Sequence, residues 1–258
     1  MSVTTVPEAL PALGLAIADL APPDEGRLMR FGVASLDQAL AGGLLCGALH
    51  EIGPAAPLQG GAAAGFALAL AVLALRPSSP SSTSRRGVVW IQPDFTALDA
   101  GILYGPGLAL MGLPMERLVI LRVPRPRDAL WAMEEALKCS AVAAVVAELG
   151  EADLTATRRL TLAAREGGGL GLILHQSMDA SPSTAMTRWE VASACGERDP
   201  FGGLGPTSFA LSLVKNRRGR TGAWRMSWDH HEHAFFPAPL SLPVAAAARD
   251  GSPSRLSA

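Results

Sequence analysis

The sequence has few charged side chains for its length. Charged residues make up 17% of the 258 residues, whereas apolar residues make up 49%, and the formal net charge is -1. So much apolar surface can offset the entropy lost on folding, which excludes a globally disordered chain. The nearly neutral charge excludes a polycation that binds nucleic acid over its whole surface, so any such contact needs a local basic cluster.

Cysteines are also few and widely separated. The sequence has three cysteines, Cys46, Cys139 and Cys195, which is an odd number, and no two of them form a Cys-x-x-Cys pair. This usage argues against a disulfide framework or a zinc site and favours a reducing compartment. The N-terminus lacks the basic and apolar regions of a secretory signal, so we expect a cytoplasmic protein.

No part of the sequence predicts a membrane span or a metal site. The uncharged segment 52–75 is broken by Pro54 and Pro57, and the rest is too short to cross about 30 Å of hydrocarbon. The run 229–233 is rich in His and acids, but no distant Cys or His residues complete a metal shell. We expect a buried helix, no membrane contact and no metal.

Strand and helix patterns alternate along the middle of the chain. Buried strands are predicted at Gly87–Gln92, Ala141–Leu149 and Leu170–Gln176, and a helix interrupted by Gly-Pro-Gly at Ala97–Met111. After residue 189 the apolar pattern alternates as in antiparallel strands. The prediction is an α/β fold of three layers, with a mostly parallel sheet and an antiparallel C-terminal extension.

Composition divides the chain into a core and two ends. Residues 1–29 are predicted to form an N-terminal arm with one helix around Glu8–Leu20, and residues 30–237 the core. Within the core, the low-complexity stretch 76–86 predicts a mobile loop. Residues 238–258, rich in Ala, Pro and Ser, are expected to be a disordered tail.

Several short motifs occur in the order found in the RecA/recombinase ATPase core. Phe31–Pro54 (FGVASLDQALAGGLLCGALHEIGP) precedes a Gly-rich loop and a helix, and VVWIQPDFTALD places Asp94 after the next strand. AVAAVVAEL ends near Glu148, and LGLILHQ ends in Gln176. Over about residues 30–230 the chain therefore resembles a RecA-like domain. The resemblance implies a catalytic carboxylate at Asp94, the Walker B acid at Glu148 and a γ-phosphate sensor at Gln176.

The phosphate-binding loop departs from this resemblance. The pattern Gly-x-x-x-x-Gly-Lys-Ser/Thr supplies backbone N–H groups, an ammonium for the phosphates and a hydroxyl for Mg²⁺. Residues 53–64 (GPAAPLQGGAAA) contain no Lys, Ser or Thr, and their glycine spacing differs. Gly53, Gly60 and Gly61 remain as a degenerate phosphate loop. We therefore expect no useful ATP hydrolysis and neither ATP nor Mg²⁺ as a cofactor, and we interpret Asp94, Glu148 and Gln176 as vestigial.

A RecA-like domain with such a loop resembles the ImuA family of bacterial inducible mutagenesis. The resemblance implies an accessory role in SOS-induced, error-prone translesion DNA synthesis. It also implies a partner of the ImuB type, which is a Y-family polymerase-like protein, and an indirect link to an error-prone C-family DNA polymerase; DNA and RecA are further candidate partners. Two alternatives remain open: a DNA-stimulated ATPase that uses Asp94 and Glu148, and a SulA-like inhibitor of cell division.

Basic residues near the C-terminal end of the core are the candidates for DNA or partner binding. The segment SLVKNRRGR resembles the RecA segment that reaches a neighbouring subunit, and a hairpin turn is predicted there. The loop 177–187 corresponds to one that contacts single-stranded DNA in recombinases. It has a single cation nearby and no aromatic residue for base stacking before Trp189. The candidates are Arg188, Lys215, Arg217, Arg218 and Arg220.

Overall fold

The computed structural model describes residues 26–76, 87–150, 152–178, 181–196, 203 and 205–238. Three predictions lie outside these residues: the arm helix around Glu8–Leu20, nearly all of the loop 76–86, and the tail that follows Ala238. The core predicted from the sequence accounts for nearly all of the described chain.

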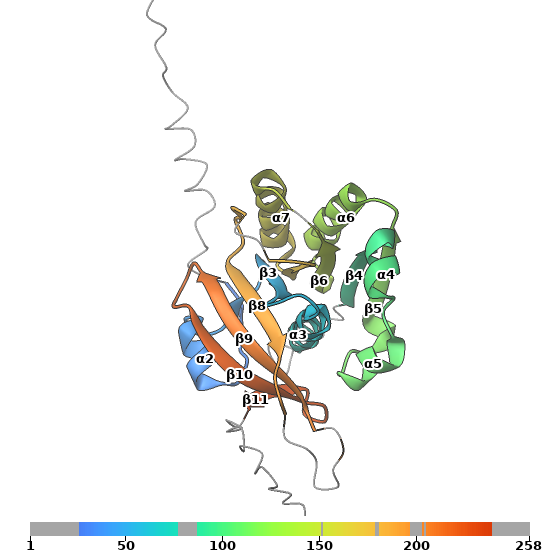
Figure 1. Ribbon diagram of the computed structural model, residues 1–258. Helices are drawn as coiled ribbons and strands as arrows, with labels where there is room; N and C mark the ends of the chain where they lie inside the picture. The colour runs from blue at the N-terminus through green and yellow to red at the C-terminus, as the bar shows by residue number, and fades with distance from the viewer. Residues whose placement is uncertain are drawn as a thin grey trace, which may run out of the picture.

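A nine-stranded sheet runs through the molecule (Figure 1). The six strands from β8 to β5 are parallel, and β9, β10 and β11 continue the sheet in antiparallel pairs, which confirms the predicted fold class. A small separate sheet pairs β1 (Leu28–Met29) with β2 (Leu44–Leu45). The order of the large sheet is β11 (Ala234–Pro237), β10 (Gly222–Asp229), β9 (Thr207–Asn216), β8 (Thr187–Ser193), β3 (Ala48–Pro54), β7 (Leu170–His175), β6 (Val142–Leu149), β4 (Gly87–Pro93) and β5 (Leu118–Val123).

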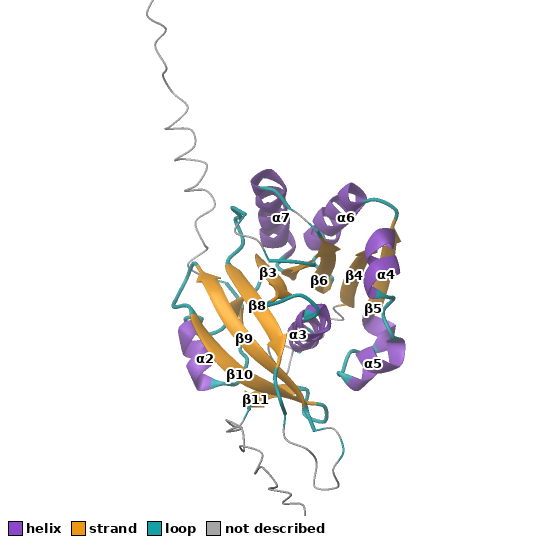
Figure 2. Ribbon diagram, in the orientation of Figure 1, coloured by secondary structure: helices purple, strands orange, loops and turns teal. Residues whose placement is uncertain are grey.

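Helices cover both faces of the sheet (Figure 2). Helix α3 (Gly60–Ala74) packs on one face, and α6 (Pro126–Lys138) and α7 (Leu154–Gly167) pack on the other. None of the described helices has the length and apolar character needed to cross a membrane. The shorter helices are α2 (Ala34–Ala39), α4 (Asp94–Ala100), α5 (Gly105–Leu110) and the 3-10 helix η1 (Met115–Arg117).

Local sequence signals set the ends of α7. The carboxylate of Asp153 accepts a hydrogen bond from the Ala156 amide at 2.7 Å, which satisfies one free N–H of the first turn. Gly168 ends the helix with a φ of 70°, a conformation that costs glycine little. A side chain at Gly167 would collide with the carbonyl oxygen of Leu137, so α6 and α7 pack closely there.

The predicted helix Ala97–Met111 is wrong, because the structure has two helices in this region. The first, α4, begins earlier, at Asp94, and ends at Gly101, whose φ of 90° turns the chain. The second, α5, begins with Pro106 in its first turn. The missing N–H of proline costs nothing there, because the N–H groups of the first turn have no partner within the helix.

Aromatic side chains fill the core between α3 and the C-terminal strands. Phe66 of α3 is fully buried, and its ring lies 5.5 Å from that of Trp189 and 6.0 Å from that of Phe209. Phe235 of β11 adds a ring at 5.8 Å from Phe66 and another contact at 4.8 Å with Trp228. The antiparallel extension is therefore fixed to the parallel half of the sheet through this cluster.

We expect Phe66→Ala to lower the free energy of unfolding by about 3–5 kcal/mol, because it leaves a cavity among four other rings. Urea unfolding followed by tryptophan fluorescence measures the change. Leu110→Ala is the control, since Leu110 is 65% exposed, and should change the value by less than about 0.5 kcal/mol. Equal losses in the two variants would contradict the central role of Phe66.

Candidate functional site

A cavity of about 180 Å³ lies where β4, β6 and β7 end and α3 begins. It brings together four residues that the sequence singled out: Gly60, Gly61, Glu148 and Gln176. None of the described residues that line it is Lys or Arg. The full lining is Gly60, Gly61, Ala64, Gln92, Thr96, Ala100, Gly101, Ile102, Leu103, Glu148, Leu174, His175 and Gln176.

The loop between β3 and α3 keeps the length of a phosphate loop but not its chemistry. Counted from Gly53, the eight-residue pattern ends at Gly60, where α3 begins. Leu58, Gln59 and Gly60 then stand at the positions of Gly, Lys and Ser/Thr. The length of the loop from Gly53 to the start of α3 therefore fits the pattern, whereas the glycine spacing differs from it, because Leu58 stands where the second glycine would be.

Each of these replacements has a local structural consequence. Leu58 has a φ of 69°, which strains a residue with a side chain, and its side chain is fully exposed. Gln59 does not face a phosphate position, because its Oε1 accepts hydrogen bonds from the Ser193 amide at 2.9 Å and the Ser193 hydroxyl at 3.0 Å. At the other end of the loop, Met178 occupies the space that a side chain at Gly53 would need. The loop is therefore held by protein contacts at both ends.

Glu148 is buried and held by two donors from β4. Trp90 Nε1 donates to Glu148 Oε1 at 2.7 Å, and Gln92 Nε2 lies 3.1 Å from each carboxylate oxygen. Burial raises the pKa of Glu148, although both hydrogen bonds oppose that change. Sequence reasoning missed Trp90 and Gln92, yet the two-residue period of a strand places them on one face, next to the acid.

Asp94 lies apart from this buried acid, whereas Gln176 shares its cavity. Asp94 begins α4, is half exposed and forms an ion pair with Arg122 at 2.9 Å. It is not among the described residues that line the cavity, so the structure does not bring the predicted carboxylate pair together around one space. Gln176 does line the cavity, and its Nε2 donates to Thr96 Oγ1 at 3.2 Å.

A second buried carboxylate, which sequence reasoning missed, lies on the opposite face of the sheet. Glu51 of β3 is 1% exposed, accepts a hydrogen bond from Arg188 Nε at 2.7 Å and lies 3.7 Å from His175 Nε2. Burial alone would raise the pKa of Glu51, but the nearby His175, hydrogen bonds from Arg188 and Ser183, and the charge of Arg188 lower it to about 2. The signal in the sequence was a single acid in a strand whose other residues, apart from His50, are apolar.

The predicted basic cluster is divided by the strand pairing. Arg188 and Lys215 lie opposite each other in β8 and β9, and both contact the segment that follows β7. Arg188 Nη2 donates to the Ser181 carbonyl at 2.7 Å and Lys215 Nζ to the Ser183 carbonyl at 2.6 Å. Burial lowers the pKa of Lys215. These two cations hold the loop after β7 in place.

The remaining cations lie in the turn between β9 and β10. Arg217 and Arg220 are exposed and Arg218 is partly buried; Arg217 Nη1 also contacts the Thr184 carbonyl at 3.3 Å. The turn rests on α2, since the Arg220 amide donates to the Ala39 carbonyl at 3.0 Å. Of the five cations predicted to bind DNA or a partner, the turn therefore leaves only Arg217 and Arg220 exposed to solvent.

The His-rich run 229–233 forms the tight turn before β11. Asp229 Oδ1 accepts hydrogen bonds from the amides of His231 at 2.7 Å and Glu232 at 3.0 Å, and these two bonds lower the pKa of Asp229. Within the described part of the chain, no group of three His, Cys, Asp or Glu side chains is placed to hold a metal ion.

We expect Glu51→Gln to lower the free energy of unfolding at pH 7 by about 3 kcal/mol, because it leaves the Arg188 guanidinium buried without its counter-charge. The folded-state pKa of Glu51 lies below its unfolded value. Its stabilising effect is therefore complete above about pH 4.5 and is lost as the pH falls toward 2. The difference in stability between wild type and variant should shrink over that range.

Urea titrations between pH 2 and pH 7 measure this difference. Asp94→Asn is the matched control, because the pair of Asp94 with Arg122 is about half exposed and should be worth less than about 1 kcal/mol. A pH-independent difference for Glu51→Gln would contradict the assignment.

The chain is similar to a curated protein and to a solved structure. Protein ImuA of Caulobacter vibrioides, from strain NA1000 / CB15N and from strain ATCC 19089 / CIP 103742 / CB 15, is 33% identical over 230 residues, covering 83% of this chain and 88% of the relative. A crystal structure of the RadB recombinase matches with a TM-score of 0.55 at 15% identity, covering 82% of this chain and 100% of that chain. No protein-family model matches the sequence.

Proposed function

Since the chain belongs to the ImuA family and has a RecA-like fold, we propose that it is a non-catalytic accessory protein of SOS-induced, error-prone translesion DNA synthesis. It acts in the cytoplasm by binding a Y-family polymerase-like partner of the ImuB type. Through that partner it is linked indirectly to an error-prone C-family DNA polymerase. The observation that carries the proposal is the replacement of Gly, Lys and Ser/Thr by Leu58, Gln59 and Gly60 at the start of α3.

The chemistry of the cavity supports a role without hydrolysis. Phosphoryl transfer needs positive charge beside the transferring group, and the described lining supplies none from Lys or Arg. The acid at the Walker B position is instead directed at Trp90 and Gln92. Because burial raises its pKa, Glu148 is also a poorer carboxylate for a metal-bound water than an exposed acid would be.

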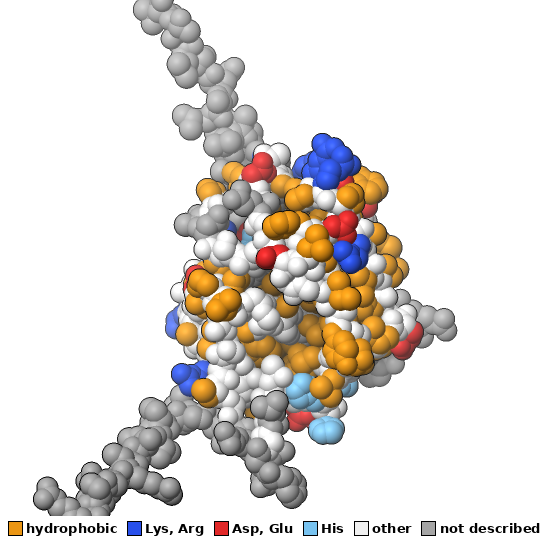
Figure 3. Space-filling view, turned by 45° about the vertical axis from the view of Figure 1, so that its right-hand side comes forward, with side chains coloured by type: hydrophobic (Ala, Val, Ile, Leu, Met, Phe, Trp, Pro, Cys, Tyr) orange, Lys and Arg blue, Asp and Glu red, His pale blue; other side chains and the backbone are white. Residues whose placement is uncertain are grey.

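An exposed apolar edge of the sheet supports partner binding. The strand β5 forms one edge of the large sheet, and Val119, Ile120 and Leu121 are all exposed on it. Exposed hydrophobic edge strands are rare, because they invite pairing with another chain. Figure 3 shows hydrophobic side chains spread over this side of the molecule. Other large hydrophobic side chains are exposed on α4, α5 and nearby segments: Phe95, Leu98, Ile102, Tyr104, Leu110 and Met115.

Charges beside this apolar edge suit a partner segment with an acidic flank. Arg122, Arg125 and Arg127 are exposed where β5 leads into α6, although Asp94 and Asp128 neutralise part of their charge. An extended apolar segment could add to the edge of β5 by main-chain hydrogen bonds. DNA and RecA remain further candidate partners, with the exposed Arg217 and Arg220 as the cations for a phosphate contact.

Restoring the loop should create a nucleotide site. We expect the triple variant Leu58→Gly, Gln59→Lys and Gly60→Thr to bind Mg-ATP at least tenfold more tightly than wild type, because it adds the ammonium and the hydroxyl. Isothermal titration measures the affinity. Leu58→Gly alone relaxes the backbone without adding charge and serves as the control. Wild-type affinity equal to that of the triple variant would contradict a lost phosphate site.

Charges placed on β5 should weaken partner binding. We expect Val119→Asp with Leu121→Asp to lower the affinity for an ImuB-type partner at least tenfold, measured by titration of purified proteins. Leu162→Asp on α7 is the control, because Leu162 is 49% exposed on a different face. Unchanged binding by the β5 variant would refute the surface. Failure of wild type to co-purify with any polymerase-like protein from damaged cells would refute the function.

A further inference from the structure

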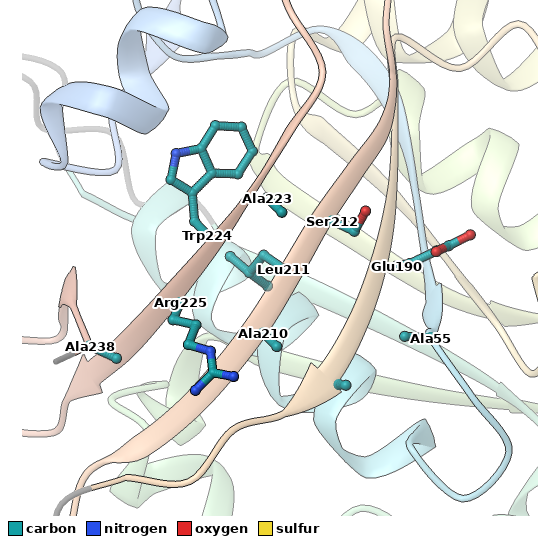
Figure 4. A pocket seen from close by; sticks show the side chains of 10 residues that line it. Ala55, Glu190, Ala210, Leu211, Ser212, Ala223, Trp224, Arg225 and Ala238 are labelled. Atoms are coloured by element: carbon teal, nitrogen blue, oxygen red, sulfur yellow. The ribbon is translucent and has the colours of Figure 1, made fainter. Parts of the chain in front are cut away.

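The described helices cover one face of the large sheet only in part. On this face α6 and α7 pack against β3, β7, β6, β4 and β5. A groove of about 490 Å³ lies on the C-terminal strands β8, β9 and β10 (Figure 4). It belongs to the same face, because Arg188 of β8 bonds to Glu51 there, and Glu190 and Ala192 follow at alternate positions of that strand.

The floor of the groove is made of small side chains from neighbouring strands. An antiparallel sheet with one face in water usually presents polar side chains to the solvent. Here alanines occupy several of these positions, so another protein surface can approach the backbone closely. The register places two rows of side chains across the three strands: Ala192, Ala210 and Arg225 in one row, and Glu190, Ser212 and Ala223 in the next.

One acid and one base border this floor on opposite sides. Glu190 belongs to β8 and Arg225 to β10, with β9 between them (Figure 4). Arg225 is exposed and Glu190 is partly exposed. Within the described part of the chain, neither side chain has a hydrogen-bond or ion-pair partner. The groove therefore carries two opposite charges that another molecule can pair.

We propose that this groove is the contact surface between two copies of the chain related by a two-fold axis. Such a contact uses the same patch on both copies, so the patch must be complementary to itself. A two-fold axis in the plane of the contact, perpendicular to the line between Glu190 and Arg225, exchanges the two positions. Each Arg225 then reaches Glu190 of the second copy, and both ion pairs form together.

The charges and shape of the groove favour a second copy over other occupants. The acid and the base balance each other, whereas a nucleic acid backbone requires an excess of cations. The aliphatic part of Arg225 can pack on Ala192 and Ala210 of the second copy while its guanidinium reaches the carboxylate. The groove and β5 lie in different parts of the sheet, with β3, β7, β6 and β4 between β8 and β5. The proposal therefore stands or fails separately from the proposed function.

Charge reversal at the two positions tests the contact. Wild type should show a monomer–dimer equilibrium in sedimentation experiments on the full chain. We expect Glu190→Arg and Arg225→Glu, each alone, to weaken self-association at least about tenfold, because each homodimer then opposes like charges twice. Glu166→Arg, the same reversal at an exposed acid of α7, is the control and should leave the equilibrium unchanged. Wild type that remains monomeric up to about 100 μM would overturn the proposal.

Mixing the two single variants distinguishes this contact from any other. In a dimer of one Glu190→Arg chain and one Arg225→Glu chain, both contacts again join opposite charges. An equimolar mixture should therefore associate with nearly the affinity of wild type, although neither variant does so alone. The double variant exchanges the two charges within one chain and should also recover. A mixture that stays monomeric, or single variants that dimerise like wild type, would overturn the proposal.

Discussion

A bound triphosphate needs a fixed cation at the start of the helix that receives it, and this requirement governs the interpretation of the whole molecule. At that place the chain has Gln59, whose amide is committed to Ser193. Its lysines are elsewhere: Lys138 pairs with Glu134 and Glu135, and Lys215 contacts the Ser183 carbonyl. The RecA-like architecture has therefore kept the loop and the helix while the charge that would make them a nucleotide site is missing.

Two buried acids show how the remaining polar groups are used. Glu148, on the α3 face, bonds to Trp90 and Gln92, whereas Glu51, on the face of α6 and α7, pairs with Arg188. Both lie in central strands whose carboxyl ends form the usual ligand-binding edge of an open α/β sheet. Each is satisfied by other parts of the chain, so these groups join neighbouring elements. The features that suit an interaction with another molecule are therefore on the exposed surface, above all on the edge strand β5.

Long-range pairing explains what the sequence could and could not predict. The parallel strands were predictable, because β4, β6 and β7 are short apolar runs with turn signals, and the order of motifs placed Gly60, Gly61, Glu148 and Gln176 near one another. Contacts such as Arg188 with Glu51 join residues 137 positions apart, and the local sequence contains no information about them. The basic cluster was overestimated for the same reason, since pairing of β8 with β9 turned Lys215 toward the loop after β7. The short strand β11 is defined by its pairing with β10, and local propensity did not indicate it.

We propose that the protein acts by binding and has no ATP hydrolysis of its own. Phosphate release from ATP, measured with the polymerase-like partner and single-stranded DNA present, tests it most directly, with a Glu148→Gln variant in parallel. The account predicts release no faster than from the partner and DNA alone, and no difference between wild type and variant. DNA-stimulated release that requires wild-type protein and is lost in Glu148→Gln would contradict it.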